Sequence, residues 1–253
     1  MQQRPVAPPP ELDALANKLV RHAVSLSLKS NSSKSPTDEA ERATMTLIST
    51  RQRDVFVTCS HVLQRLEQMR KEDPSAQMVA YIGLDGRLAE LTGFKLIDSN
   101  ERPLDIAIFQ GMEDRITLAG LEFIDYASSY LPDPIPGDFI SIVGYPGANI
   151  TFTPKKGLFG YMHLGLPASS VSEKRIVLAN EHGSREFVHY GDPGLRSIPL
   201  GGLSGSPAFA HRDGQLRFVG IVTDGSARDQ TILISRLGCI NTDGTINGNL
   251  VPC

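Results

Sequence analysis

One glycine-rich stretch of the chain has the composition of a site for acyl transfer. Residues 199–209 read PLGGLSGSPAF, which places Ser204 and Ser206 among three glycines and two prolines. This much glycine allows a sharp loop that lifts one hydroxyl clear and directs backbone N–H groups toward the same point. A nucleophile and an oxyanion hole are the two parts of an acyl-transfer site. The alternative is a glycine-rich hairpin turn with two solvated serines.

A nucleophilic serine needs a base to take its proton and an acid to orient that base. His61, one of only six histidines, ends an apolar strand expected at 54–59, where a helical turn begins. Asp105 opens the apolar run IAIF at 106–109, so its carboxylate should be partly buried and should have a partner. Taken singly, the histidine could be structural and the aspartate could cap a turn.

Three segments together resemble the signature segments of the trypsin-like (chymotrypsin-fold) serine peptidases. They are TCSH at 58–61, LDIAI at 104–108 and GLSGSP at 202–207, in the family order His, Asp, Ser. His61 precedes Asp105 by 44 residues, and Asp105 precedes Ser204 by 99, which suits the family. Residues 137–146 resemble the first strand of the second barrel, and residues 220–225 resemble the strand against which a substrate backbone lies. The resemblance covers roughly residues 20–238.

The resemblance implies a role for each site residue. Ser204 would be the nucleophile, His61 the general base and acid, and Asp105 the group that holds the imidazole tautomer. The N–H groups of Gly202 and Ser204 would form the oxyanion hole. The substrate pocket would be lined by four residues: Ile198, Thr223, Asp224 and Gly225.

The implied reaction is endopeptidase hydrolysis of a protein or peptide through an acyl-enzyme, without metal or cofactor. Two alternatives remain open: a protease-fold binding module that has lost catalysis, and an esterase. An α/β-hydrolase is disfavoured because its serine precedes both partners in the chain. Ile198 lies six positions before Ser204, where family members that cleave after basic residues carry an acid. A preference for Lys or Arg is therefore not expected by that route.

Leu203 separates this chain from the zymogen-activated members of the family. Those members have an aspartate directly before the nucleophile, which pairs with a newly cut N-terminus. Because Leu203 cannot form that ion pair and paired cysteines are absent, the chain looks more like the bacterial trypsin-like or glutamyl-endopeptidase-like members. Control of activity is then expected to come from loop ordering, a regulatory partner or an activating domain.

The predicted fold class is all-β: two antiparallel six-stranded β-barrels of chymotrypsin type, with a short N-terminal helix. Frequent short strands separated by turn signals favour barrels over βαβ units. The predicted organisation is a disordered arm at 1–10, a helix and first barrel at 11–130, a linker and second barrel at 131–240, and a loose polar tail at 241–253. A helical turn is expected at 61–71. The strands are expected at 24–28, 44–49, 54–59, 77–82, 88–97, 104–109, 139–144, 148–153, 157–162, 175–179, 186–190, 206–210, 217–222 and 231–234.

Composition sets limits on partners and location. The 253 residues carry a formal net charge of −3, which gives no general attraction to nucleic acid or to an anionic membrane. No apolar run reaches the roughly 18 residues of a membrane span, and the first ten residues lack a secretory signal. The three cysteines fit neither a disulfide framework nor a zinc site, so a cytoplasmic location is expected.

Three smaller features of the sequence predict structure and no additional site. His182, His189 and Asp192 lie close together but fit no tetrahedral metal pattern, so a polar loop is expected there. The Asp213–Gly214 pair predicts a hairpin turn. Cys59 lies in an apolar run and is expected to be a buried thiol.

Overall fold

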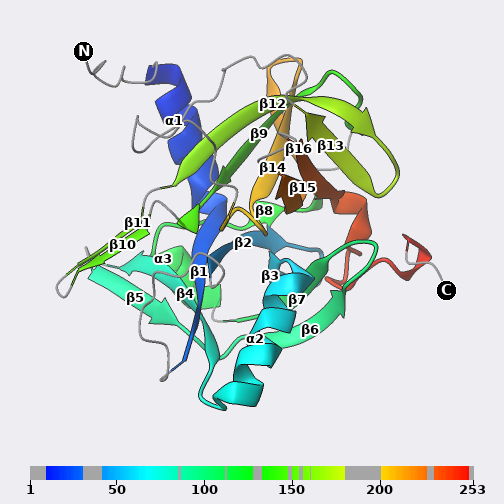
Figure 1. The fold of residues 1–253 in the computed structure, drawn as a ribbon. Helices are drawn as coiled ribbons and strands as arrows, with labels where there is room; N and C mark the ends of the chain where they lie inside the picture. Colours follow the sequence, from blue (N-terminus) through cyan, green and yellow to red (C-terminus); the bar gives the residue numbers. More distant parts are fainter. Residues whose placement is uncertain are drawn as a thin grey trace.

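Two β-sheets, one in each half of the chain, form the body of the protein (Figure 1). The computed structural model describes residues 10–30, 42–84, 87–111, 113–127, 133–147, 150–153, 156–159, 161–179, 201–226 and 231–250. Strands dominate and helices are few, so the predicted all-β, two-barrel fold class is confirmed.

The first sheet contains eight strands and is open within the described part of the chain. Its order is β5-β4-β1-β2-β3-β7-β6, and β8 pairs with β2 in parallel while the other pairs are antiparallel. The prediction of six strands therefore undercounts this half. The strands are β1 (Ala23–Lys29), β2 (Arg42–Ser49), β3 (Asp54–Thr58), β4 (Gln77–Leu84), β5 (Arg87–Leu91), β6 (Lys95–Asn100), β7 (Ile106–Gln110) and β8 (Ile124–Asp125).

The second sheet is a closed six-stranded barrel with the order β12-β13-β16-β15-β14-β9. Its strands alternate inward apolar residues with outward ones, which is the period-two pattern of a barrel wall. A separate hairpin joins β10 (Ile150–Thr153) to β11 (Lys156–Phe159). The barrel strands are β9 (Phe139–Gly144), β12 (Met162–Val171), β13 (Arg175–Ala179), β14 (Pro207–Arg212), β15 (Gln215–Ser226) and β16 (Thr231–Arg236).

The helices are short and peripheral. None in the described part of the chain has the length and apolarity that a membrane crossing needs. The predicted N-terminal helix is α1 (Pro10–Leu19), followed by the 3-10 turn η1 (Val20–His22). The predicted helical turn is the full helix α2 (Ser60–Glu72). The remaining elements are α3 (Glu113–Leu118), η5 (Leu237–Cys239) and η6 (Gly248–Leu250).

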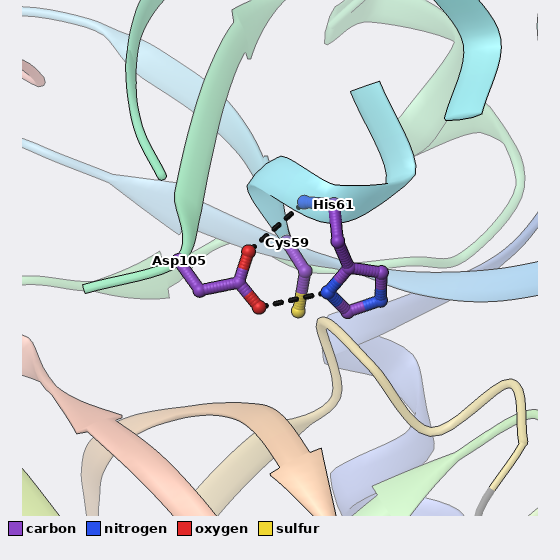
Figure 2. A group of neighbouring side chains, drawn as sticks. All are labelled: Cys59, His61 and Asp105. Atoms are coloured by element: carbon purple, nitrogen blue, oxygen red, sulfur yellow. Dashed lines mark hydrogen bonds and ion pairs between the residues drawn. The ribbon is translucent and has the colours of Figure 1, made fainter. Parts of the chain in front are cut away.

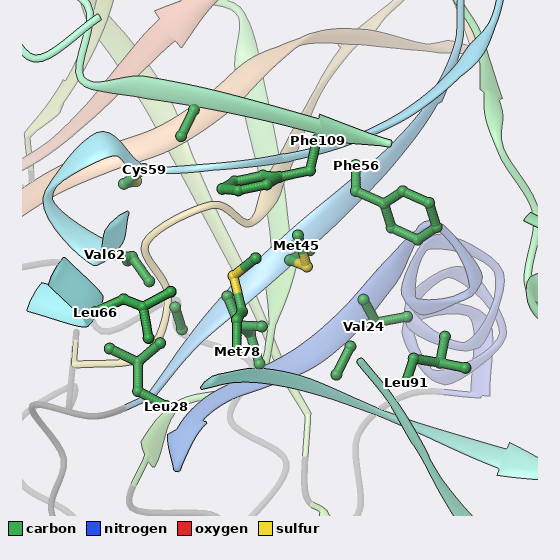
Figure 3. Close-up of a cluster of buried hydrophobic side chains, with 14 of the residues drawn as sticks. Val24, Leu28, Met45, Phe56, Cys59, Val62, Leu66, Met78, Leu91 and Phe109 are labelled. Atoms are coloured by element: carbon green, nitrogen blue, oxygen red, sulfur yellow. The ribbon is translucent and has the colours of Figure 1, made fainter. Parts of the chain in front are cut away.

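The core of the first sheet fixes the helix that carries His61. On α2, Val62, Leu66 and Met69 are buried in a cluster that includes Met45 and Phe56 (Figure 3). Burying three apolar side chains of this size contributes several kcal/mol toward holding the helix in place. Because those residues face the core, the neighbouring His61 lies on the exposed side of the same helix.

Several predicted elements were wrong in detail. The single strand predicted at 88–97 is two strands, β5 and β6, separated by a bend in which Gly93 has a φ of +79°. Strand β12 was missed because Gly165 and Pro167 argue against a strand, yet both pair with β9. Helix α3 was missed as well. The strand predicted at 186–190 and the group His182, His189 and Asp192 lie outside the described residues.

The tail predicted to be loose is packed over residues 241–250. Ile246 and Leu250 are buried in the cluster that also holds Val57 and Ile106 of the first sheet. Asp98 Oδ2 accepts a hydrogen bond of 2.9 Å from the Ile246 N–H. These contacts override the polar, glycine-rich composition that predicted mobility.

A buried hydrogen-bonded group joins three strands of the closed barrel on its outer side. The Ser141 hydroxyl lies 2.7 Å from His211 Nε2 and 2.9 Å from His163 Nε2. A serine has one proton to donate, so at most one histidine can accept from it and at least one must donate to it. His163 Nδ1 is buried and has no hydrogen-bond partner among the described residues. The less costly arrangement leaves that nitrogen unprotonated, with His163 Nε2 as the donor.

Burial, followed by the nearby charge of His211, lowers the pKa of His163 to about 4. In the unfolded chain, His163 becomes protonated below a pH of about 6.5. In the folded chain, it becomes protonated only below about 4. We expect the free energy of unfolding to fall as the pH falls through this window. His163→Gln should reduce the loss between pH 7 and pH 5 by up to about 2 kcal/mol, measured by urea unfolding. Parallel pH profiles for the variant and the wild type would contradict this.

Candidate active site

His61 and Asp105 meet at the junction of β3 with α2 and the start of β7. Asp105 Oδ2 lies 2.7 Å from His61 Nδ1, and Asp105 Oδ1 accepts a hydrogen bond of 2.9 Å from the His61 backbone N–H (Figure 2). The carboxylate thus holds both the ring and the main chain of the histidine. This leaves the outer ring nitrogen, Nε2, as the position from which a proton can be exchanged.

The backbone around Asp105 fixes its direction. Asp105 has a φ of +51°, a conformation that aspartate tolerates better than most residues. The preceding Leu104 is fully buried, and its carbonyl accepts a hydrogen bond of 2.5 Å from Ser235 Oγ. A 3.1 Å bond from the Leu104 N–H to Asn100 Oδ1 completes the anchor. The turn therefore delivers the carboxylate to His61 from a buried base.

The loop that carries Ser204 is held by the first sheet. Two threonines of β2, both fully buried, contact it from the face of the strand opposite Met45 and Leu47, which face the first core. Thr44 donates its N–H to Ser204 O at 2.9 Å and its hydroxyl to Gly202 O at 2.9 Å. The Thr46 hydroxyl donates to Gly205 O at 2.6 Å. Three of the four carbonyls from Gly202 to Gly205 are thus fixed by one strand of the other half of the chain.

Two glycines of this loop are required by space as well as by backbone angle. Gly202 has a φ of +92°, and a Cβ there would lie 2.6 Å from the Gly147 nitrogen. Gly205 has a φ of +88°, and a Cβ there would lie 2.0 Å from Thr44 O. A side chain at either position would push the loop away from β2 or from the segment after β9. The glycines predicted to shape this loop are therefore explained by close backbone approach.

The loop leaves two backbone donors available beside Ser204. Within the described part of the chain, neither the Gly202 N–H nor the Ser204 N–H donates a hydrogen bond. Ser204 is partly exposed, whereas Ser206 is fully buried with its hydroxyl packed against Gly144. The structure therefore separates the two serines of the motif by exposure.

Cys59 lies directly behind the three predicted residues. Its thiol donates to Val222 O at 3.2 Å and is fully buried. Burial raises the pKa of the Cys59 thiol well above its usual value, and hydrogen bonding with Ser204 opposes this only in part. The thiol is therefore neutral, as expected of a buried cysteine. Because Cys59 lies near His61 and Asp105 and also interacts with Ser204, Ser204 lies close to the His61–Asp105 pair. No hydrogen bond joins Ser204 to His61 in the part of the chain described.

The Cys59, His61 and Asp105 donors lie within 4.8 Å of one another, which invites comparison with a metal site. The Nδ1–Oδ2 separation of 2.7 Å is a hydrogen bond. Two ligands of a tetrahedral zinc at about 2.0 Å would lie about 3.3 Å apart. The spacing of the pair therefore fits a shared proton better than a shared cation.

Two carboxylates raise the pKa of His61 above its usual 6.5. The hydrogen bond to Asp105 is the largest cause, burial opposes it, and the charges of Asp105 and Asp224 add to it. Both carboxylates favour the imidazolium form. An imidazole in this setting is a stronger base than a solvated one.

The predicted pocket residues are described only in part. Thr223 is buried at the base of the site, and its carbonyl lies 3.8 Å from Cys59 Sγ. Asp224 and Gly225 follow it and are exposed. Ile198 lies outside the described residues. Sequence reasoning missed Thr44 and Thr46, because a threonine on a strand carries no signal of a long-range contact.

The fold combines an open eight-stranded sheet with a closed barrel. Between them lie a His–Asp pair and a serine loop shaped by two glycines. This arrangement defines a two-barrel protein of chymotrypsin type. The chain is similar to several solved structures, of which Deg5 supports the fold. Deg5 matches with a TM-score of 0.50 at 12% identity, covering 88% of each chain. The thermostable serine protease AL20 from an extremophilic microorganism gives 0.48 at 12% identity, covering 87% of this chain and 92% of that one. The serine protease domain of the Sesbania mosaic virus polyprotein gives 0.45 at 14% identity, covering 85% and 88%.

A family profile described as a trypsin-like peptidase domain matches residues 44–221. This span is well over half of the chain, so the protein belongs to the trypsin-like peptidase family and is a serine-type endopeptidase by class. No curated protein sequence matches significantly. The predicted family is confirmed, while the bacterial or glutamyl-endopeptidase-like subfamily stays a prediction.

The Thr44 hydroxyl gives a direct test of how the serine loop is held. Thr44→Val removes the donor to Gly202 O and the acceptor for the Tyr145 N–H at 3.0 Å. We expect a loss of about 1–3 kcal/mol in the free energy of unfolding and a fall in kcat of at least about tenfold. Thr50→Val removes a hydroxyl that serves only a turn, donating to Arg53 O at 2.8 Å, and is the matched control. Equal kcat values for the two variants would contradict the role of Thr44.

The pKa of His61 can be followed by NMR of its ring protons. We expect titration above pH 6.5 in the wild type, because the imidazolium is stabilised by Asp105. Asp105→Asn should lower the pKa of His61 by removing the charge that contributes most. Asp213→Asn, at the distant β14–β15 hairpin, makes the same charge change as a control. A pKa of His61 that is unchanged in Asp105→Asn would refute the assignment.

Proposed function

We propose that this chain hydrolyses peptide bonds with Ser204 as nucleophile, His61 as general base and acid, and Asp105 as the residue that orients the base. The observation that carries the proposal is the two-point hydrogen bonding of His61 by Asp105 beside a partly exposed serine whose loop is fixed by β2. Geometry of this kind fixes the tautomer of the imidazole, with the proton on Nδ1 and the lone pair on Nε2.

The first half-reaction forms the acyl-enzyme. The Ser204 oxygen attacks the carbonyl carbon as its proton passes to His61 Nε2, and Asp105 stabilises the imidazolium that results. The oxyanion accepts hydrogen bonds from the Gly202 and Ser204 N–H groups, which have no described acceptor of their own. The imidazolium then protonates the leaving amine as the C–N bond breaks. In the second half-reaction, water attacks the acyl carbon as its proton passes to His61, and the ester bond then breaks as the imidazolium returns a proton to the Ser204 oxygen.

A serine-to-alanine pair inside one motif tests this proposal. Ser204→Ala should lower kcat/KM by at least about 10⁴-fold on a peptide substrate while the protein stays folded. Ser206→Ala is the matched control, because its hydroxyl is buried and makes no hydrogen bond with a described residue. It should retain near wild-type turnover.

A fluorophosphonate probe gives an independent readout of the same site. It should label the wild type and the Ser206→Ala variant at Ser204, and it should not label Ser204→Ala. Wild-type turnover in folded Ser204→Ala would refute the assignment of the nucleophile. A folded wild type that neither cleaves peptides nor takes up the probe would favour the alternative of a catalytically silent binding module.

A further inference from the structure

We propose that Asp224 selects substrates that carry a lysine or arginine close to the scissile bond. The inference rests on the proposed function, because it assigns a substrate class to acyl transfer at Ser204. It concerns β15, the strand beside the loop that carries Ser204. It does not depend on residue 198, the position at which family members that cleave after basic residues carry an acid.

At residues 223–225, close to the loop that carries Ser204, one edge of β15 pairs with no other described strand. Pairing with β14 ends at the partners Ile221 and Pro207. The next residue, Val222, donates its N–H to Ser206 O at 2.9 Å and accepts from the Gly205 N–H at 2.7 Å. Beyond it, Asp224 and Gly225 pair with β16, and residues 223–225 pair with no other described strand. An unpaired strand edge is where an extended peptide adds by backbone hydrogen bonding.

The Asp224 side chain is exposed on this edge and held in place. Its Oδ1 accepts a hydrogen bond of 2.7 Å from the Gly225 N–H, which leaves Oδ2 without a described partner. No salt bridge engages this carboxylate among the described residues, whereas Asp138, directly before β9, is bound by Arg212. A fixed carboxylate with a free oxygen can receive a cation at little cost in side-chain entropy.

The negative charge of Asp224 acts on His61 and on the neighbouring Cys59 thiol. It adds to the effects that raise the pKa of His61 and of the Cys59 thiol. Among the described residues, the charged groups that act on His61 in this way are Asp105 and Asp224, and both are acidic. Both oxygens of Asp105 bond to His61, so of these two described carboxylates Asp224 is the one that a substrate can approach. A cationic side chain nearby is attracted, and an anionic one is repelled.

The predicted size of the preference follows from the exposure of the pair. Exposed ion pairs contribute modestly, and salt screens them with a Debye length that falls from about 10 Å at 0.1 M to about 3 Å at 1 M. We therefore expect a three- to tenfold effect, roughly, on kcat/KM at low salt, and a smaller one at 1 M NaCl.

A peptide series measures the preference. Each peptide carries Lys, Met or Glu at one position, from four residues before the scissile bond to three after it. The wild-type chain should cleave the Lys peptide faster than the Met peptide, and the Met peptide faster than the Glu peptide, at one of these positions. Asp224→Asn should remove the difference. Asp213→Asn, with the same charge change at the opposite end of β15, should keep it.

The outcomes separate this inference from the proposed function. Cleavage that Ser204→Ala abolishes but that shows no preference among Lys, Met and Glu overturns the role of Asp224 alone. A preference that persists in Asp224→Asn does the same. If the folded wild type cleaves no peptide, the proposed function fails, and binding of the same peptides is measured by fluorescence anisotropy. Equal affinities for Lys and Glu peptides then overturn the inference, and a difference that Asp224→Asn removes supports it.

Discussion

The contact on which the rest of the site depends is the one between β2 and the serine loop. Thr44 and Thr46 lie on the first sheet, yet their hydrogen bonds end on Gly202, Ser204 and Gly205 in the second half of the chain. Each bond is worth only about 1 kcal/mol net. Their value lies in position, because they hold the loop against the same sheet that carries His61 and Asp105.

This contact also explains why the loop has the residues it has. A backbone that approaches β2 so closely leaves no room for a Cβ at Gly202 or Gly205. Between them, Leu203 is buried against Gly144, where zymogen-activated relatives would have an acid. An apolar side chain gains its stability from packing as soon as the chain folds. The support of this loop therefore comes from packing and from β2, and Leu203 has no charge to offer a cut N-terminus.

The sequence predicted the parts of the site that are local. The order of His61, Asp105 and Ser204 and the apolar strands beside them indicated the family, and the family model and fold agree. What it could not predict depends on distant contacts. Strand β12 forms despite Gly165 and Pro167 because barrel closure supplies partners on both sides. The tail at 241–250 is ordered because Ile246 and Leu250 fill a core built by other segments. Thr44 and Thr46 are ordinary strand residues until the loop is placed on them.

The ionisable groups around the serine have different roles because they are buried to different extents. Cys59, the strongest potential nucleophile nearby, is fully buried, and its raised pKa keeps it a neutral thiol. It therefore adds no negative charge beside Ser204 and does not compete for the proton of His61. Asp105 is partly buried and committed to His61 through both oxygens, so its charge serves the imidazolium. Asp224 is exposed and keeps one oxygen free, so its charge is the part of this field that a substrate can meet directly.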